Sequence, residues 1–475
     1  MTLSEFNGRK LRLLVGIASY GEKNLDYLRK IIGIYQNLPF DVDIVVFSEA
    51  SRELDPNVKV VVGLPSRNSW SLPFAHKPYF AEHLENYDLF IYSEDDVEVS
   101  AEKIQAFLRV TEVLDPTEIA GYLRYELDPS GTTILTDVHG PFHWKPDSVR
   151  RRGEYVVAEF TNEHAGFYIL TRAQLQHVIA SGGFLMEPYE GRYGLPETAA
   201  TDPYTNCGLR KVICISALDD FLLHHMSNLY VVRHGVLLEA FKAQVQTLMD
   251  ICNSLHPAST LCEVESRFLH NAWSKSYHEL PCDELLNMIP NPARSILSVG
   301  CGSGESEARL QQRGSKVTAL PLDSVIGAAA AGRGVEIIYG TLAEGLEILR
   351  GRKFDSVVMS NLLHLLPDPW SVLKECAKLV REGGTLVIAG PNFKSISVLL
   401  RRALASKDYS KLRTFAESGI HAFGITSLTT EVERAGLDVT AVRWFDSTPP
   451  RDLIALRRWF GRLMAKDWVI QARKK

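Results

Sequence analysis

The sequence Ser298-Val299-Gly300-Cys301-Gly302-Ser303-Gly304-Glu305 follows two apolar residues and precedes a helical pattern over residues 305–312. Its alternating glycines indicate a strand, a tight turn and a helix, because glycine permits positive φ and lets a ligand approach the amides at a helix N-terminus. A simple strand-to-helix connection without a ligand would show the same pattern. The residues that follow therefore decide between the two interpretations.

Downstream of the glycines, strand-like and helix-like segments alternate regularly. A helical pattern over residues 369–381 is followed by Glu382-Gly383-Gly384, where glycine can stop a helix and turn the chain into the next strand. This alternation predicts a doubly wound α/β domain with a Rossmann-like sheet. The predicted strands span residues 316–320, 335–339, 354–359, 384–389, 437–444 and 468–472.

Residues 291–475 resemble the class I S-adenosylmethionine-dependent methyltransferases. The resemblance rests on the glycine motif, on Phe354-Asp355-Ser356-Val357-Val358 as the family's fourth strand, and on residues 361–369 as the segment after it. It implies S-adenosyl-L-methionine as the cofactor and O-methylation as the reaction. The residues that it implies for cofactor binding are Ser298, Gly300, Gly302, Gly304, Asp323 and Asn361.

Three positions depart from that family's pattern. Ser298 stands where an acid usually precedes the first glycine, and Pro321 stands where an acid usually holds the ribose hydroxyls. Gly340-Thr341 stands where an acid often borders the adenine. Loss of a carboxylate that binds a diol is expected to weaken cofactor binding by about 1–3 kcal/mol, unless Asp323, two residues after Pro321, takes its place.

Two histidines of this half, His364 and His421, have two interpretations. Either could be the base that removes a proton from an acceptor hydroxyl. Each is more often a hydrogen-bonded structural residue, because methyl transfer often needs only correct positioning.

In the first half, Leu89-Phe90-Ile91-Tyr92-Ser93 has the pattern of a buried strand and runs directly into Glu94-Asp95-Asp96. Three consecutive acids at a strand end are costly unless a cation is near, and Glu94 and Asp96 lie on one face of an extended chain. A divalent cation that bridges a ligand diphosphate would explain them. A solvated acidic turn would also explain them.

Upstream, strand patterns over residues 11–17, 42–47 and 58–62 accompany a helical pattern over residues 24–36. With the acidic strand end, this order resembles the glycosyltransferases of the GT-A fold over residues 11–232, with Glu94-x-Asp96 matching the family's Asp-x-Asp motif. The resemblance implies a nucleotide-sugar donor and Mn²⁺ or Mg²⁺ held by Glu94 and Asp96. At the donor it places Ala18, Ser19, Tyr20, Glu49, Lys77 and Asp95, although a lone lysine such as Lys77 is more often a solvated surface charge.

The acceptor side follows from the same resemblance. Residues 163–172 look like the family's acceptor-side strand, and the chain after them carries Glu197 and Asp202. The resemblance implies Glu197 as the base that deprotonates the acceptor, with Asp202 second; an acidic helix cap is an equal alternative. It further implies that His225 or His224 completes the metal shell, whereas satisfied core histidines are commoner.

Composition is that of a globular protein with more than one domain. The chain has 475 residues, 45% of them hydrophobic and 23% charged, and exceeds the size at which a single core stops growing. Its net charge of −5 argues against general nucleic-acid binding. Seven cysteines without a paired motif favour reduced thiols. We therefore expect a cytoplasmic protein, with neither a signal peptide nor a membrane span.

We predict a fold of two Rossmann-like α/β domains joined by a helical linker. The predicted boundaries are residues 1–235 for the GT-A-like domain, 236–290 for the linker and 291–475 for the methyltransferase-like domain. Helical patterns over residues 237–255 and 260–271 support the linker, and residues 273–289 are expected to cover the second sheet as a helix.

The segment 451–466 has two interpretations. Leu453, Leu456 and Phe460 share one helical face, and basic residues lie largely elsewhere. Such a helix can lie on an anionic membrane, which would place the enzyme peripherally at the inner face of the membrane. Packing on the domain's own sheet is the favoured alternative.

These observations predict a bifunctional, glycan-modifying transferase of surface polysaccharide or glycolipid synthesis. The first domain would transfer a sugar from a nucleotide-sugar donor with a divalent cation, and the second would methylate the same glycan or lipid-linked glycan acceptor. Two alternatives remain. In one, the second domain is an inactive pseudo-methyltransferase that serves as a scaffold; in the other, the first domain binds nucleotide sugar without catalysis.

Overall fold

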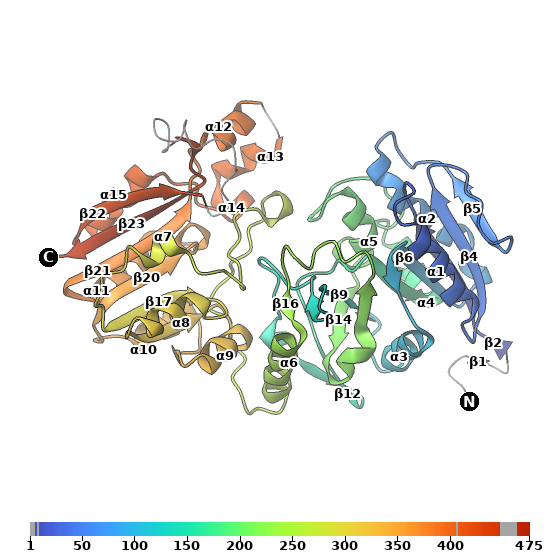
Figure 1. The fold of residues 1–475 in the computed structure, drawn as a ribbon, viewed down its shortest axis with the longest axis horizontal. Helices are drawn as coiled ribbons and strands as arrows, with labels where there is room; N and C mark the ends of the chain where they lie inside the picture. The colour runs from blue at the N-terminus through green and yellow to red at the C-terminus, as the bar shows by residue number, and fades with distance from the viewer. Residues whose placement is uncertain (1–4, 7–8, 405–406, 447–462) are drawn as a thin grey trace. The chain divides into compact units, whose positions relative to one another are not determined.

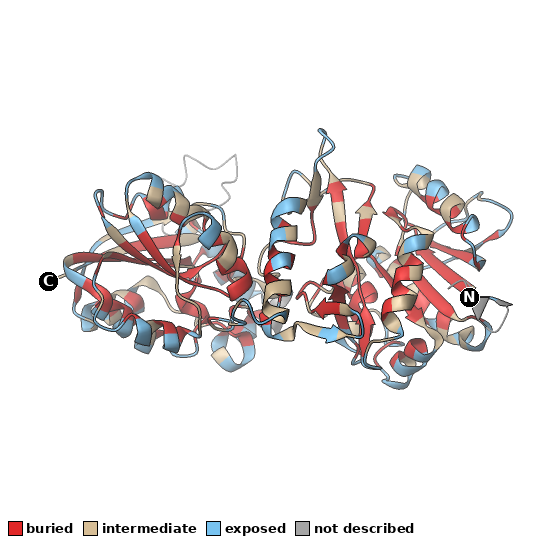
Figure 2. Ribbon diagram, turned by 90° about the horizontal axis from the view of Figure 1, so that it is seen from below, coloured by how far each residue is buried: buried red, intermediate tan, exposed pale blue. Residues whose placement is uncertain are grey.

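The computed structural model describes residues 5–6, 9–404, 407–446 and 463–475 and divides the chain into two units. Unit 1 is Met1–Asn253 and unit 2 is Ser254–Lys475 (Figure 1). In both units the central strands are buried, and the helices expose one side only (Figure 2). This one-sided exposure is typical of helices that cover a sheet.

The main sheet of unit 1 has the strand order β13-β6-β3-β4-β5. Strands β3 to β6 are parallel, and β13 pairs antiparallel with β6 at the edge. The structure confirms the strands predicted from the sequence here and the helix between the first two. The strands are β3 (Arg12–Ala18), β4 (Asp41–Ser48), β5 (Val58–Val62), β6 (Leu89–Glu94) and β13 (Phe167–Thr171), and the helix is α1 (Leu25–Gln36).

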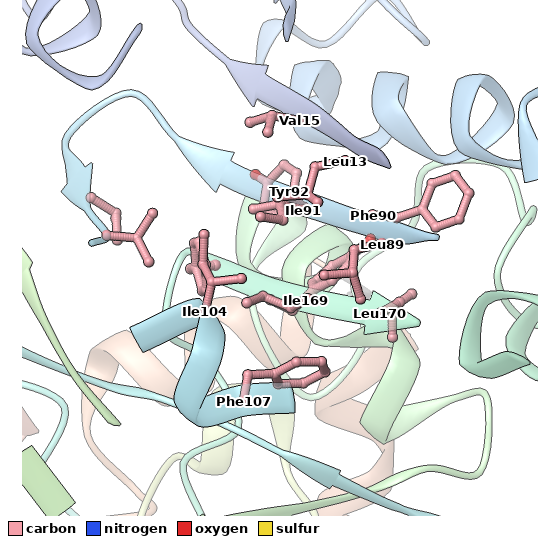
Figure 3. Packing of buried hydrophobic residues seen from close by; sticks show 14 of the residues in the cluster. Leu13, Val15, Leu89, Phe90, Ile91, Tyr92, Ile104, Phe107, Ile169 and Leu170 are labelled. Carbon is pink, nitrogen blue, oxygen red and sulfur yellow. The ribbon is translucent and has the colours of Figure 1, made fainter. Parts of the chain in front are cut away.

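The core of unit 1 lies against this sheet. Figure 3 shows Leu13 and Val15 of β3, Ile91 of β6 and residues of β13 packed near α3 (Ala101–Thr111), which contributes Ile104 and Phe107. Apolar residues run almost without interruption along β3 and β6, because a sheet covered on both faces buries successive side chains.

Beside a two-stranded sheet of β1 (Glu5–Phe6) and β2 (Arg9–Lys10), two larger sheets complete the described part of unit 1, with strand orders β16-β10-β9-β15-β7 and β11-β12-β14-β8. The strands of the first are β7 (Val97–Glu98), β9 (Leu123–Leu127), β10 (Thr133–Leu135), β15 (Leu222–His225) and β16 (Val236–Leu237). Those of the second are β8 (Glu118–Ala120), β11 (Arg150–Arg152), β12 (Tyr155–Ala158) and β14 (Arg210–Cys214). The helices are α2 (His76–Glu82), α4 (Arg172–Ala180), α5 (Leu195–Thr205) and α6 (Leu238–Cys252).

Unit 2 contains one seven-stranded sheet, ordered β19-β18-β17-β20-β21-β23-β22. Strands β17 to β21 are parallel, and β23 lies antiparallel between β21 and β22 (Figure 1). This confirms the doubly wound sheet and its six strands predicted after the glycine motif. The strands are β17 (Ser295–Cys301), β18 (Lys316–Pro321), β19 (Glu336–Ile337), β20 (Phe354–Ser360), β21 (Val380–Pro391), β22 (Leu437–Phe445) and β23 (Asp467–Lys474).

Helices cover both faces of this sheet. Successive residues of β17 point to opposite faces, so Ile296 packs in one hydrophobic cluster with Leu310 of α8, and Leu297 packs in another with Leu373 of α11. The helices are α7 (Asp283–Leu286), α8 (Glu305–Gln312), α9 (Ser324–Gly332), α10 (Leu342–Ile348), α11 (Pro369–Leu379), α12 (Ile396–Ala403), α13 (Lys407–Ser410), α14 (Phe415–Ser418) and α15 (Ile425–Arg434).

Two local predictions differ from the structure. Helix α11 ends at Leu379 and strand β21 has already begun at Val380, so Gly383, at φ 72°, bends the strand and does not end the helix. The predicted helical linker is divided between the units: α6 belongs to unit 1, whereas residues 254–282 are mostly irregular and belong to unit 2.

The segment predicted as a basic amphipathic helix lies largely outside the described residues, since 447–462 are not among them. In the described part of the chain, no helix combines the length and the apolar character needed to cross a bilayer. All seven cysteines are free thiols.

Candidate functional site

A cavity of about 420 Å³ in unit 1 brings together many of the residues predicted from the sequence. A larger groove of about 830 Å³ lies along α10 and α11 in unit 2, but it contains no predicted site residue. Because the cavity of about 420 Å³ is lined by predicted residues, it is the candidate site of unit 1. Of the predicted residues it is lined by Ala18, Tyr20, Glu94, Asp95, Asp96, Glu197 and His225.

The acidic residues lie where strand β6 ends. Glu94 pairs with Ala18 of β3, and its amide donates to the Gly166 carbonyl at 2.9 Å. Gly166 has φ 59°, and a Cβ there would stand 2.6 Å from the Glu94 carboxylate. Only glycine therefore lets the two strands hold this carboxylate at the cavity.

Strand β15 decides which histidine reaches the acids. It pairs antiparallel with β7, and consecutive side chains point to opposite faces. His225 Nε2 lies 3.1 Å from Asp96 Oδ2, and its Nδ1 lies 2.6 Å from Glu126 Oε1. His224 points the other way, stacked on Tyr125.

The charge of the cavity is unbalanced. Burial, with help from the charges of Asp96 and Glu197, raises the pKa of Glu94 to about 7, although Arg124 opposes the shift. Burial likewise raises the pKa of Asp95 to about 6. Burial would lower the pKa of His225, but its hydrogen bonds to Asp96 and Glu126 outweigh this and raise it to about 9. Arg124 and His225 offset only part of the cost of burying Glu94, as expected for a site that can accept a further positive charge.

The donor atoms at this position are those that suit a hard divalent cation. Glu94 and Asp96 offer carboxylate oxygens, and His225 offers Nε2, which lies 3.1 Å from Asp96 and would have to be unprotonated to bind a cation. The described side chains contain no group of three or more such residues already arranged around a single point. Binding a cation here would therefore require the side chains to draw closer.

Several cavity residues carried no prediction. Arg124 Nη1 lies 4.0 Å from Glu94, and its Nη2 donates to Asp137 at 2.9 Å. Asn24 donates to Asp95 at 2.8 Å. Trp70, 67% exposed, stands at the cavity with a large uncovered ring. The remaining unpredicted residues of the lining are Ser69, Leu72, Pro73, His164, Pro196, Leu229 and Tyr230.

One signal could have identified Arg124. The segment Leu123-Arg124-Tyr125-Glu126 alternates apolar or aromatic residues with charged ones, which is unusual for a buried strand. Arg124 pairs with Asp137, 13 positions further on, and Glu126 pairs with His225, 99 positions further on.

Four predicted residues do not line the cavity. Ser19 is buried beside it, and its amide donates to Phe47 of β4. Glu49 accepts from the Gly21 amide at 3.1 Å and pairs with Arg52 at 3.3 Å. Partial burial opposes these contacts, but the net pKa of Glu49 is lowered. Glu49 therefore holds the turn after β3 in place.

Lys77 and Asp202 form a buried ion pair with each other. Their exposures are 1% and 0%, and Asp202 also accepts from the Tyr189 hydroxyl at 2.6 Å. Lys77 is thus neither a donor contact at the cavity nor a solvated surface charge. Asp202, the second choice for the catalytic base, is committed to this pair, because helix α5 turns it away from the face that carries Glu197.

The raised pKa of Glu94 predicts a pH effect on stability. Its carboxyl stabilises the fold fully below its ordinary pKa of 4.5, and this contribution is lost as the pH rises through about 7. With EDTA present, we expect the melting temperature of Glu94→Gln to rise relative to that of the wild type between pH 4.5 and 7.5. The comparison is between the two proteins because buried histidines such as His143, whose pKa burial lowers to about 4, make stability rise with pH in both. Thermal unfolding at a series of pH values measures the difference. A difference that does not change with pH would contradict the assignment, and Glu98→Gln is the matched control.

In unit 2 the predicted motif forms the turn from β17 to α8. Gly300 and Gly304 have φ of 79° and 85°, as the sequence predicted for a tight glycine turn. Ser298, which replaces the expected acid, donates through its hydroxyl to Glu307 at 2.6 Å. Glu307 comes from α8, so a carboxylate lies behind the first glycine even though the motif itself lacks one.

The remaining predicted cofactor residues have partners within the protein. Asp323 is 2% exposed and accepts from the Ile326 amide at 2.7 Å, which makes it the N-cap of α9. Burial raises its pKa to about 7, although the capped amides oppose this. Asn361, at φ 49°, donates to Glu279 at 2.6 Å. Neither side chain is free to hold a ribose in this conformation.

The two histidines of unit 2 have structural contacts. His364 is buried and pairs with the Trp273 carbonyl at 2.8 Å, and burial lowers its pKa to about 4. His421 stacks on Phe415 and lies 3.2 Å from the Pro367 carbonyl. These contacts favour the structural interpretation of both.

Comparisons with known proteins concern unit 2. Residues 297–388 match the family model described as a methyltransferase domain. Ubiquinone biosynthesis O-methyltransferase from Erwinia tasmaniensis is 26% identical over 165 residues, which cover 34% of this chain and 62% of that protein. The Stutzerimonas stutzeri protein of the same name is 29% identical over 136 residues, covering 26% and 59%. The chain thus spans about three fifths of the length of these relatives.

Solved structures of methyltransferases are also similar. A SAM-dependent methyltransferase from Archaeoglobus fulgidus is 19% identical with a TM-score of 0.30, covering 38% of this chain and 87% of that one. N-methyltransferase NodS from Bradyrhizobium japonicum, solved with S-adenosyl-L-homocysteine, is 14% identical with a TM-score of 0.29, covering 40% and 84%.

The strand order of the seven-stranded sheet, the glycine turn and the family match define the class of unit 2. Unit 2 contains a class I S-adenosylmethionine-dependent methyltransferase domain.

Proposed function

We propose that this protein is a bifunctional transferase that modifies a glycan in the cytoplasm. Unit 1 transfers a sugar from a nucleotide-sugar donor with a divalent cation. Unit 2 transfers a methyl group from S-adenosyl-L-methionine to a hydroxyl of the same glycan or lipid-linked glycan.

One observation carries the proposal for unit 1: the acidic end of β6 and His225 meet in a single cavity. Its volume of about 420 Å³ lies within the range of about 300–1,000 Å³ that small-molecule sites occupy. The parallel strand order also agrees with ligand binding at the carboxyl ends of strands. Glu94, Asp96 and His225 would hold Mn²⁺ or Mg²⁺, which supplies charge neutralisation for the leaving diphosphate.

Glu197 is the residue best placed to act as the base. It lies in the first turn of α5 and lines the cavity with the acidic cluster. In this scheme the acceptor oxygen bonds to the anomeric carbon while the bond from that carbon to the diphosphate breaks. Glu197 takes the proton of the acceptor hydroxyl.

The glycine turn supports methyl transfer by unit 2. Gly302 permits a close approach to the turn, which the Tyr277 carbonyl oxygen makes in this structure, since a Cβ at Gly302 would stand 2.4 Å from that oxygen. The loop 298–304 would hold the cofactor, with Asn361 joining it once Glu279 releases its side chain, and the cofactor supplies an activated methyl group when bound. The relatives named for ubiquinone biosynthesis support O-methylation as the reaction type. Two sites in one chain would keep a shared acceptor at high effective concentration.

A thermal-shift panel tests both halves on the full chain. UDP-, GDP- and CMP-sugars are each tested with Mn²⁺ or with EDTA, and S-adenosyl-L-homocysteine is tested separately. We expect one nucleotide sugar to raise the melting temperature only with Mn²⁺, because stabilisation grows with ligand concentration over Kd. Failure of every nucleotide sugar to shift the melting temperature would contradict sugar transfer and make the buried acidic cluster a structural network with His225 and Asn24.

A further inference from the structure

Residues 259–279 of unit 2, which we call the strap, lie across the carboxyl ends of β17 and β18. The Ser324 amide donates to the Ser259 carbonyl at 2.9 Å, and the Leu261 amide donates to the Leu322 carbonyl at 2.8 Å. The Leu342 amide donates to the Leu261 carbonyl at 2.9 Å. One end of the strap is therefore bonded along the residues that follow β18 and at the start of α10.

These are the positions at which a methyltransferase cofactor is expected. The methyltransferase resemblance places the ribose contact at residues 321–323 and the adenine border at residues 340–341. In this structure the strap takes the backbone hydrogen bonds there, and Thr260 forms a bridge with Asp323. The strap thus stands where the nucleoside would have to lie.

The strap also covers the glycine turn. The Ser303 amide donates to the Tyr277 carbonyl at 3.0 Å, and this carbonyl is the group that approaches Gly302. Tyr277 is 1% exposed and packs in one hydrophobic cluster with Leu261 and Leu322. The space left at the glycine turn is about 30 Å³, whereas small-molecule sites occupy about 300–1,000 Å³.

A polar contact fixes the other end of the strap. Lys275, 1% exposed, pairs with Glu279, and Glu279 accepts from Ser360 at 3.2 Å and from Asn361 at 2.6 Å. Ser360 and Asn361 lie at the carboxyl end of β20. Glu279 is therefore a latch between the strap and the strand beside the glycine turn.

The strap is held in a strained form. His270, Asn271 and Trp273 have φ of 52°, 51° and 64°. Histidine and asparagine adopt this left-handed conformation more readily than other residues, so the strain lies chiefly at Trp273. Such strain persists only when the surrounding contacts impose it, and it clusters at clamps and switch regions. Dissociation of the strap would release this strain, which favours its displacement when a ligand replaces its contacts.

We propose that the strap is an intramolecular competitor of the cofactor, which must be displaced before S-adenosyl-L-methionine can bind to unit 2. This inference rests on the proposed methyl transfer. It assigns to the cofactor the space that the strap now fills, so that uptake of the cofactor depends on an opening of residues 259–279. The proposal rests on one observation. The glycine turn has the expected conformation, but the protein's own chain fills the space beside it.

Two measurements on the full chain test the strap. Calorimetric titration with S-adenosyl-L-homocysteine compares the wild type with Glu279→Gln, which removes the charge of the latch and leaves Lys275 buried without its partner. We expect the variant to bind at least ten times more tightly. Glu263→Gln is the matched control, since Glu263 lies on the exposed side of the strap and should bind like the wild type.

Hydrogen exchange on the wild-type protein gives a readout that needs no variant. Saturating S-adenosyl-L-homocysteine should speed exchange of the amides of Leu261 and Ser303, which the strap protects. Equal affinity of wild type and Glu279→Gln, with unchanged exchange at 259–279, would overturn the strap and leave methyl transfer standing. Absence of binding to both proteins, with faster strap exchange in Glu279→Gln, would overturn methyl transfer together with the competition and make unit 2 a scaffold.

Discussion

Replacing Asp96 with asparagine is expected to lower sugar transfer by unit 1 at least about 10³-fold, which corresponds to about 4 kcal/mol in activation free energy. Asp96 joins the acidic strand end to His225. Its loss removes a cation ligand and the partner that holds the imidazole in place, while the side chain keeps its size. The assay measures release of nucleoside diphosphate from the nucleotide sugar that raises the melting temperature in the thermal-shift panel. Mn²⁺ is titrated in the wild type and in Asp96→Asn.

Glu98→Gln is the control for Asp96→Asn. Glu98 lies in the same segment, two residues further on, but it pairs with Lys30 on the surface and does not line the cavity. This variant should turn over like the wild type. If Asp96→Asn retained normal turnover with normal Mn²⁺ dependence, the metal site would be wrong, whatever the stability of the variant.

Replacing Lys77 with methionine is expected to destabilise unit 1 by about 3–5 kcal/mol. The substitution leaves the Asp202 carboxylate fully buried, with a hydrogen bond from the Tyr189 hydroxyl but without the positive charge of Lys77. Burial lowers the pKa of Lys77, and the Asp202 carboxylate offsets this only in part, so the pair is costly to keep and more costly to break. Urea unfolding, followed by hydrogen exchange of α2 and α5, measures the loss.

A double substitution separates the pair from its neighbours. Lys77→Met combined with Asp202→Asn buries no charge, so we expect it to recover most of the lost stability. Asp26→Asn is the control for an exposed ion pair, because Asp26 and Arg29 are solvated; it should change stability by less than about 0.5 kcal/mol. Equal effects of Lys77→Met and Asp26→Asn would contradict a structural role for the buried pair.

The sequence predicted the sheets well because their signals are local. Apolar runs mark β3, β4 and β6, and glycines at fixed spacing mark the turn from β17 to α8. Each such element is decided by a few adjacent residues whose backbone preferences agree with the final fold. The order of the strands within each sheet depends on contacts between distant segments, which these local signals do not show.

The partners of charged side chains could not be predicted in this way. Lys77 and Asp202 are 125 positions apart, and nothing next to either residue shows that they meet. The sequence predicts helices over residues 260–271 and 273–289, which include most of the strap. Its amides bond instead to residues such as Leu322, far along the chain, and three of its residues adopt left-handed conformations that no helix allows.

The position of β23 has a consequence for how unit 2 is made. This strand, at residues 467–474, lies between β21 and β22, so β22 joins the sheet only through a segment synthesised after it. Until those residues leave the ribosome, the growing chain presents two unpaired strand edges. Unpaired edges recruit other strands, and a nascent chain that exposes them is prone to aggregate. The folding yield of unit 2 should therefore depend on chaperones that cover these edges during translation.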